Sequence, residues 1–116
     1  SDNGGDTCNG MHAGKEIHFK GLKELCESIK KYGAAATLQL FHVGAQGNTH
    51  FSNQRVVGPS KYIVPDIGIQ AEVLSIDEIK KIENDFAECI HQGDRAGYDF
   101  IEIHLAHGYL LHEFLK

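Results

Sequence analysis

The sequence predicts an α/β fold built on parallel strands, of which this chain supplies only a portion. Two observations lead to this prediction. Helix-type and strand-type hydrophobic patterns alternate along the 116 residues, and only two segments have the character of buried strands. Two parallel strands leave two unpaired edges, so they do not complete a sheet. A (β/α)8 TIM barrel has eight such strands in about 250 residues, and we expect about two of its units here, in one partial domain spanning 1–116.

The first expected element is an amphipathic helix from Lys20 to Tyr32, which follows an irregular segment at 1–19. Apolar residues recur in it at the spacing of one helix face, and Gly33 provides the stop signal. The predicted buried face consists of Leu22, Leu25, Cys26 and Ile29.

A mostly apolar run at 34–42 predicts a buried strand, with Thr37 and Gln39 on one side. The connection that follows, 43–74, is far longer than the median of about 4 to 6 residues. Loops of that length often carry function, so this connection is a candidate part of a site.

A second helix is expected to begin at Ser75. Ser75 and Glu78 match a capping box, and Leu74 with Ile79 matches a hydrophobic staple. The helix should end at Gly97 and pass Gly93 at a cost of about 1 kcal/mol. Its predicted core positions are Ile82, Phe86, Cys89 and Ile90.

The expected second strand, 98–104, alternates between two faces. Ile101 and Ile103 lie on one face, and Glu102 and His104 lie on the other. A right-handed βαβ crossover therefore joins the two strands, and a short helix is expected from Tyr109.

Proton-handling side chains cluster where this strand ends. His104, His107 and Tyr109 fall within six positions, and the polar face of the strand leads directly into them. Ligands of parallel α/β folds bind at the carboxyl ends of the strands, so a site is predicted here. A structural role for the histidines and packing of the Tyr109 ring against the last helix are the competing interpretations.

The overall composition favours small-molecule chemistry. A net charge of -5 and a pI near 5.8 argue against nucleic-acid and anionic-membrane partners. Cys8, Cys26 and Cys89 are widely spaced without a Cys-x-x-Cys pair, which predicts no disulfide framework and a reducing cytoplasm. No apolar run approaches the roughly 18 residues of a membrane-spanning helix.

Three motifs resemble the old yellow enzyme family of FMN-dependent oxidoreductases. The resemblance covers about 22–115, which corresponds to the third and fourth barrel strands with the helices around them. The last motif is the most specific of the three. The motifs are Gln39-Leu-Phe-His42-Val-Gly44, Gly58-Pro-Ser60 and Ile101-Glu-Ile-His-x-x-His-Gly-Tyr-Leu-Leu-His-Glu-Phe-Leu115.

The resemblance implies FMN and NAD(P)H as cofactors and a small-molecule substrate. It implies that Gln39 hydrogen-bonds the pyrimidine edge of the flavin, although a buried strand glutamine satisfied by backbone is the simpler interpretation. It implies that His104 and His107 hydrogen-bond a carbonyl or phenolate oxygen, and that Tyr109 delivers a proton to the α-carbon. The implied reaction is reduction of an α,β-unsaturated carbonyl by hydride from flavin N5.

The chain also departs from the family pattern. Ala45 stands where many members have arginine, and the usual Ser-Pro and later strands do not follow Lys116. We therefore expect a fragment that retains little FMN and is inactive unless it assembles with a complementing barrel segment or with copies of itself.

Two other functions remain open from the sequence. Exposed strand edges could make the chain a non-catalytic oligomerising or partner-binding module. The other function is metal-dependent hydrolysis, with a metal bound by His104, His107, His112 and Glu113. The spacing of these residues matches no standard zinc motif.

Overall fold

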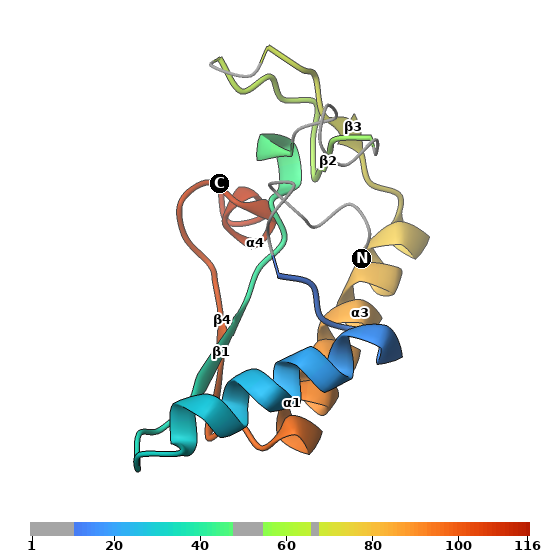
Figure 1. Ribbon diagram of the computed structural model, residues 1–116. Helices are drawn as coiled ribbons and strands as arrows, with labels where there is room; N and C mark the ends of the chain where they lie inside the picture. Colours follow the sequence, from blue (N-terminus) through green and yellow to red (C-terminus); the bar gives the residue numbers. More distant parts are fainter. Residues whose placement is uncertain (1–10, 48–54, 66–67) are drawn as a thin grey trace.

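The computed structural model describes residues 11–47, 55–65 and 68–116. Strands β1 (Thr37–Leu40) and β4 (Phe100–Ile103) lie side by side and run parallel, with Gln39 opposite Glu102. Helix α3 (Ile76–Ala96) connects them, which confirms the predicted crossover. Both α3 and helix α1 (Glu16–Lys30) lie on the same side of this pair (Figure 1).

Helix α1 begins at Glu16, four residues before the Lys20 expected from the sequence, and ends at Lys30. Its N-cap, Lys15, makes no side-chain capping bond, so no sequence signal marks the start. Tyr98, just before β4, donates from its hydroxyl to the carbonyl oxygen of Leu22 at 3.1 Å and ties α1 to the sheet.

The start of α3 agrees with its sequence signals. Ser75 is the N-cap, and both reciprocal bonds of the capping box with Glu78 are present. At the other end Gly97 takes a left-handed conformation with φ 91°. A glycine pays no Cβ penalty there, which is why the helix stops at this residue.

In each helix, one residue that the sequence predicted to be buried is exposed. Leu25 on α1 and Ile90 on α3 are both 39% exposed, although their spacing placed them in the core. The two-stranded sheet is too narrow to cover the full width of either helix face. The main core beneath the sheet comprises Leu22, Cys26, Ala36, Leu38, Leu40, Ala96 and Tyr98.

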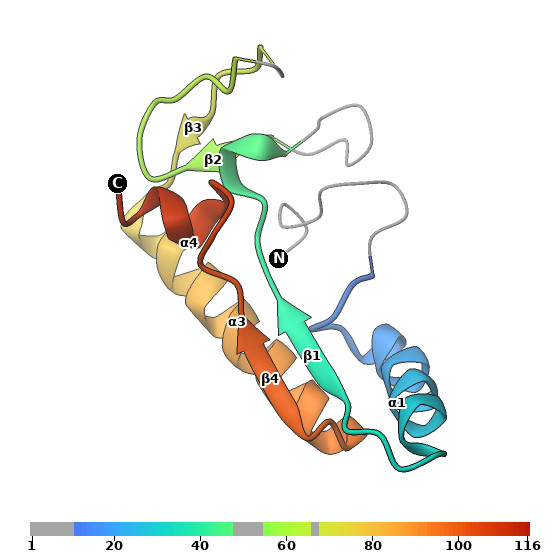
Figure 2. The same ribbon diagram turned by 90° about the vertical axis from the view of Figure 1, so that its left-hand side faces the viewer.

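The long connection contains short structure of its own. A 3-10 turn, η2 (Gly44–Gln46), follows β1, and two-residue strands β2 (Val57–Gly58) and β3 (Glu72–Val73) pair in parallel. Helix α4 (Leu110–Glu113) packs against η2, with Tyr109 as its N-cap. These pieces gather at the carboxyl ends of β1 and β4 (Figure 2).

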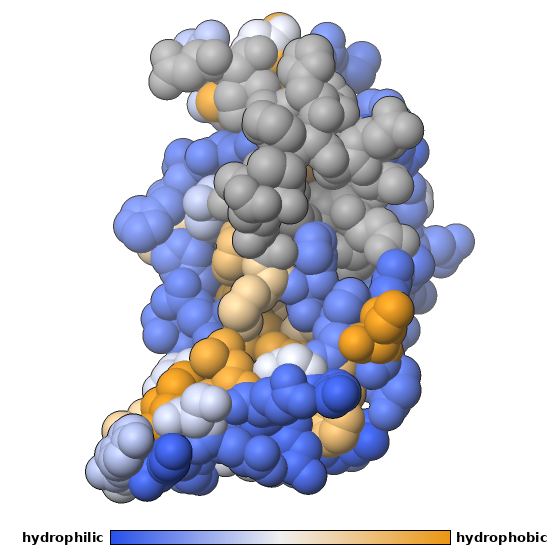
Figure 3. Space-filling model, in the orientation of Figure 1, coloured by the Kyte–Doolittle hydropathy of each residue, from blue (hydrophilic) through white to orange (hydrophobic). Residues whose placement is uncertain are grey.

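Hydrophobic residues also reach the surface. Phe100 of β4 is 63% exposed and Ile17 of α1 is 83% exposed. The space-filling view shows apolar surface next to α1 (Figure 3). None of the helices in the described ranges is long and apolar enough to cross a bilayer.

Candidate functional site

The exposed face of the β1–β4 pair carries a row of polar side chains. Gln39 and Glu102 are exposed and lie opposite each other in the parallel register. Gln39 Nε2 donates to Glu102 Oε1 at 2.9 Å. His104 follows two residues after Glu102, so it continues the same face beyond the end of the strand.

The structure brings the three predicted site residues together. His104 Nε2 and His107 Nδ1 are 3.1 Å apart and hydrogen-bonded to each other. The Tyr109 ring lies edge-on to both imidazoles, with centroid distances of 5.4 Å to His104 and 6.4 Å to His107. The ring of Phe41 also stacks on the Tyr109 ring, with the two centroids 5.4 Å apart.

The turn that presents His107 adopts an uncommon backbone conformation. His107 has φ 61°, the only positive φ among the described non-glycine residues, and Gly108 continues with φ 76°. A left-handed conformation costs a side-chain-bearing residue about 1 to 2 kcal/mol.

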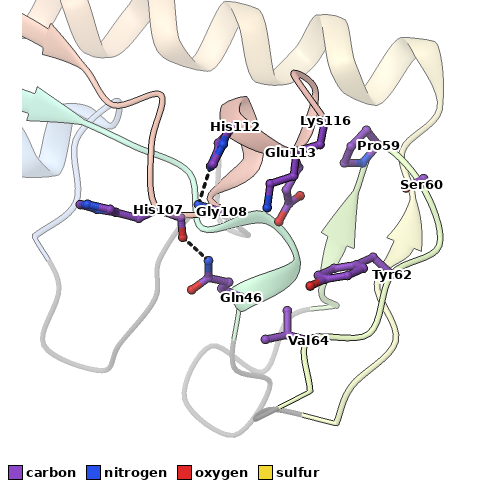
Figure 4. A pocket seen from close by; sticks show the side chains of 10 residues that line it. All are labelled: Gln46, Pro59, Ser60, Tyr62, Val64, His107, Gly108, His112, Glu113 and Lys116. Carbon is purple, nitrogen blue, oxygen red and sulfur yellow. Dashed lines mark hydrogen bonds between the residues drawn. The ribbon is translucent and has the colours of Figure 1, made fainter.

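Two neighbouring side chains hold this turn (Figure 4). Gln46 Nε2 donates to the carbonyl oxygen of His107 at 2.6 Å, and His112 Nδ1 accepts from the backbone N–H of Gly108 at 2.8 Å. No local sequence pattern indicates Gln46, because it contacts His107 from 61 positions away. The sequence suggests a metal-binding role for His112, whereas in the structure its ring accepts a hydrogen bond that holds the turn.

A pocket of about 590 Å³ lies beside the turn, between α4 and the connection after β2. His107 itself points away from the centre of this pocket, and Glu113 and Tyr62 point into it (Figure 4). The lining residues are Gln46, Pro59, Ser60, Tyr62, Val64, His107, Gly108, His112, Glu113 and Lys116.

His42 is a buried residue whose role sequence reasoning did not identify. Its side chain is 3% exposed, and its Nδ1 accepts from the backbone N–H of Gly44 at 3.1 Å. Burial lowers the pKa of His42 to about 4, so the ring is neutral at neutral pH. Its carbonyl oxygen also accepts from the N–H of Leu110, which joins the end of β1 to α4.

Glu113 forms a second unpredicted anchor. Its Oε1 accepts from the backbone N–H of Ala45 at 2.8 Å, and its buried Oε2 has no hydrogen-bond partner. Burial is the main cause that raises the pKa of this carboxyl above 4.5, against the opposing effect of the Ala45 N–H. Gly44 permits the contact, because a Cβ there would lie 2.6 Å from the carboxylate.

Within the part of the chain that the structure describes, no three His, Cys, Asp or Glu side chains are grouped to hold a metal ion. The imidazole of His112 and the carboxylate of Glu113 are instead directed at backbone N–H groups.

Comparison with known proteins identifies the family to which the sequence is similar. A model of the NADH:flavin oxidoreductase / NADH oxidase family matches residues 2–116. The NADPH dehydrogenase of Bacillus pumilus is 35% identical over 99 residues, which cover 85% of this chain and 28% of the relative. That of Clostridium acetobutylicum is 34% identical over 118 residues, which cover 97% of this chain and 34% of the relative.

Solved structures share the fold. The old yellow enzyme homologue of Zymomonas mobilis superposes with a TM-score of 0.90 at 22% identity, covering 100% of this chain and 35% of that one. A 2-naphthoyl-CoA reductase in complex with 2-naphthoyl-CoA gives a TM-score of 0.93 at 23% identity, and the match covers 98% of this chain and 19% of that one. These likenesses confirm the predicted portion of a (β/α)8 barrel.

Proposed function

The chain belongs to the NADH:flavin oxidoreductase / NADH oxidase family, as its motifs predicted, and from this premise we propose that it forms part of an FMN-dependent NAD(P)H oxidoreductase. The proposed reaction is reduction of an activated alkene conjugated to a carbonyl. The observation that carries the proposal is the row of Gln39, Glu102 and His104 that leads to the bonded pair of His104 and His107.

The residues on this face fit a flavin. Apart from its bond to Glu102, the Gln39 amide has no hydrogen-bond partner among the described residues, so its carbonyl oxygen and second N–H suit the alternating donor and acceptor groups of the pyrimidine edge. When bound, FMN would accept hydride from NAD(P)H and supply it to the alkene. The chain spans 28% of the Bacillus pumilus relative, so residues outside it are needed to complete the proposed enzyme.

The two histidines would bind the substrate carbonyl oxygen. Their nearest ring nitrogens are 3.1 Å apart and bond to each other, so an oxygen at ordinary hydrogen-bond distance from both would replace that mutual bond. Two convergent N–H donors withdraw electron density from the β-carbon and stabilise the enolate that develops. Tyr109, next to both rings, would then protonate the α-carbon.

Half-reactions of the FMN-loaded protein separate these roles. With 2-cyclohexenone as the substrate, His104→Ala should lower kcat/KM for the enone by about 100-fold, because one oxygen-binding donor is lost. Reduction of the flavin by NADPH should remain within about twofold. His91→Ala, an exposed histidine on α3, is the matched control.

Tyr109→Phe should lower enone turnover by about 100-fold while enone binding persists. If both single variants, His104→Ala and Tyr109→Phe, turned over the enone at the wild-type rate, the proposal would be contradicted.

The reducing cytoplasm expected from the sequence is compatible with Cys26 and Cys89, which are both free thiols.

A second candidate function is supported by the sheet edges. Each strand of the β1–β4 pair has a partner on one side only, within the described residues. Such edges can pair with another chain, so an oligomerising or partner-binding module without flavin is the alternative.

A further inference from the structure

The bond between Gln39 and Glu102 links two residues at matching positions of β1 and β4. They are opposite each other in the register, both are exposed, and Nε2 and Oε1 are 2.9 Å apart. The bond therefore lies across the two strands, on the face that leads to His104.

The chemistry of the two groups determines which end of the amide faces Glu102. A carboxylate only accepts hydrogen bonds, so the amide nitrogen must point toward it. The reversed amide would place two oxygens 2.9 Å apart with no proton between them. The orientation consequently does not depend on which amide atom is assigned as nitrogen.

We propose that Glu102 is a positioning residue: its hydrogen bond fixes the order in which the Gln39 amide presents its carbonyl oxygen and remaining N–H. A ligand that matches this order carries a cyclic imide edge, in which an N–H lies between two carbonyl groups. The inference rests on the proposed function, because the isoalloxazine pyrimidine ring has such an edge.

Removal of Glu102 leaves the amide free to adopt either order. Binding would then require the ligand to immobilise the side chain, which corresponds to about a three- to tenfold weaker affinity. A glutamine at position 102 restores a carbonyl acceptor, so Glu102→Gln should recover much of the effect, whereas Glu102→Ala should not.

The first test needs no cofactor. In NMR spectra of the whole chain, the chemical shift of one Gln39 side-chain amide proton should differ from the shifts of an exposed glutamine such as Gln70. Glu102→Ala should move it to that exposed value, and Glu102→Gln should keep most of the difference. Unchanged Gln39 signals in Glu102→Ala would overturn the inference.

A similar pair elsewhere provides the matched control. Gln92 Nε2 donates to Glu88 Oε1 at 3.2 Å within α3. Glu88→Ala should change the Gln92 amide signals and leave those of Gln39 as in wild type. Equal disturbance of Gln39 by both variants would reveal a general effect on folding and would contradict a specific role for Glu102.

The second test uses FMN as the probe, followed through the Gln39 signals. The Kd should rise about three- to tenfold in Glu102→Ala and stay within about twofold in Glu102→Gln. Equal affinity in wild type and Glu102→Ala would overturn the positioning role. If FMN leaves the wild-type Gln39 signals unchanged, the flavin role of Gln39 fails, while the cofactor-free spectra still decide whether Glu102 orients the amide.

Discussion

Gly44 and Glu113 fit together at the end of β1, and no larger residue can replace the glycine without disturbance. Gly44 has φ 61°, and a Cβ on it would lie 2.6 Å from Glu113 Oε2. Gly44→Ala should therefore destabilise the fold through backbone strain and through displacement of the carboxylate. We expect a loss of about 2 to 4 kcal/mol in the free energy of unfolding, measured by urea denaturation.

Gly33→Ala separates the two causes. Gly33 also has a positive φ, 86°, but a Cβ there would meet no atom within 4 Å. This control should cost only about 1 to 2 kcal/mol. Equal losses in the two variants would show that the contact with Glu113 contributes nothing to stability.

Glu113 should make the stability depend on pH. Because burial raises its pKa in the folded state above 4.5, its favourable contribution is present below 4.5 and is lost as the pH rises through the folded value. Glu113→Gln removes this titration while keeping an oxygen that can accept from Ala45. Wild type should thus lose stability relative to Glu113→Gln as the pH increases from about 4 to 7 in urea denaturation. A constant difference across that range would contradict this assignment.

Gly93 is the point at which α3 approaches the sheet. A Cβ there would lie 2.6 Å from Ile101 Cδ1 and 3.0 Å from Leu38 Cδ2. Alanine favours a helix by about 1 kcal/mol over glycine, but overpacking of this kind costs about 1 to 3 kcal/mol. Gly93→Ala should lower the thermal midpoint. Gly21→Ala on α1, where a Cβ meets nothing within 4 Å, should raise it. A rise in both would show that the close approach can relax.

The N-terminus of α3 offers a second test at this scale. Ser75→Ala removes the hydroxyl that accepts from the Glu78 N–H, and should cost about 1 kcal/mol of unfolding free energy. Ser28→Ala is the matched control, because that hydroxyl donates to the Glu24 carbonyl oxygen inside α1. Alanine in a helix interior should be neutral or slightly stabilising. If both changes have the same effect, the cap does not stabilise α3.

These elements also show what local sequence can predict. The capping box at Ser75 is confined to one segment and predicted the start of α3 correctly. The apolar run at 34–42 predicted a strand, but β1 is shorter, Thr37–Leu40, and Gln39 is exposed on it rather than buried. The start of α1 at Glu16 was missed because no capping residue precedes it. Leu25 and Ile90 have core spacing, but spacing alone does not tell how wide the opposing sheet is.

The site divides in the same way. His104, His107 and Tyr109 are close in sequence, and their proximity in space was predictable. The contacts of Gln46 with His107 and of Glu113 with Ala45 join residues more than 60 positions apart. Their partners are determined by the tertiary fold, so neither could be found from a local pattern.

At the scale of the molecule, the open sheet should cause self-association. Phe100 is 63% exposed on β4, whose outer edge has no partner strand among the described residues. Phe100→Lys should shift the sedimentation profile toward monomer, because charge and loss of apolar surface both oppose edge pairing. Ile17→Lys on α1, at a residue 83% exposed, makes the same chemical change away from the sheet and should shift it less. Equal shifts would assign association to general hydrophobicity.

The chain alone should retain little FMN, even if one face of it binds the flavin as proposed. In the proposed site Gln39 alone would meet the pyrimidine edge, and the chain spans only 28% of the Bacillus pumilus relative. A cofactor held on one side stays hydrated and binds weakly, since small-molecule sites normally bury most of the ligand surface. Gel filtration with flavin absorbance should show protein without stoichiometric FMN in the monomer peak. Flavin that instead elutes with an associated form would mean that a second copy completes the site. Stoichiometric FMN on the monomer would contradict the prediction and would mean that this portion of the barrel binds the cofactor by itself.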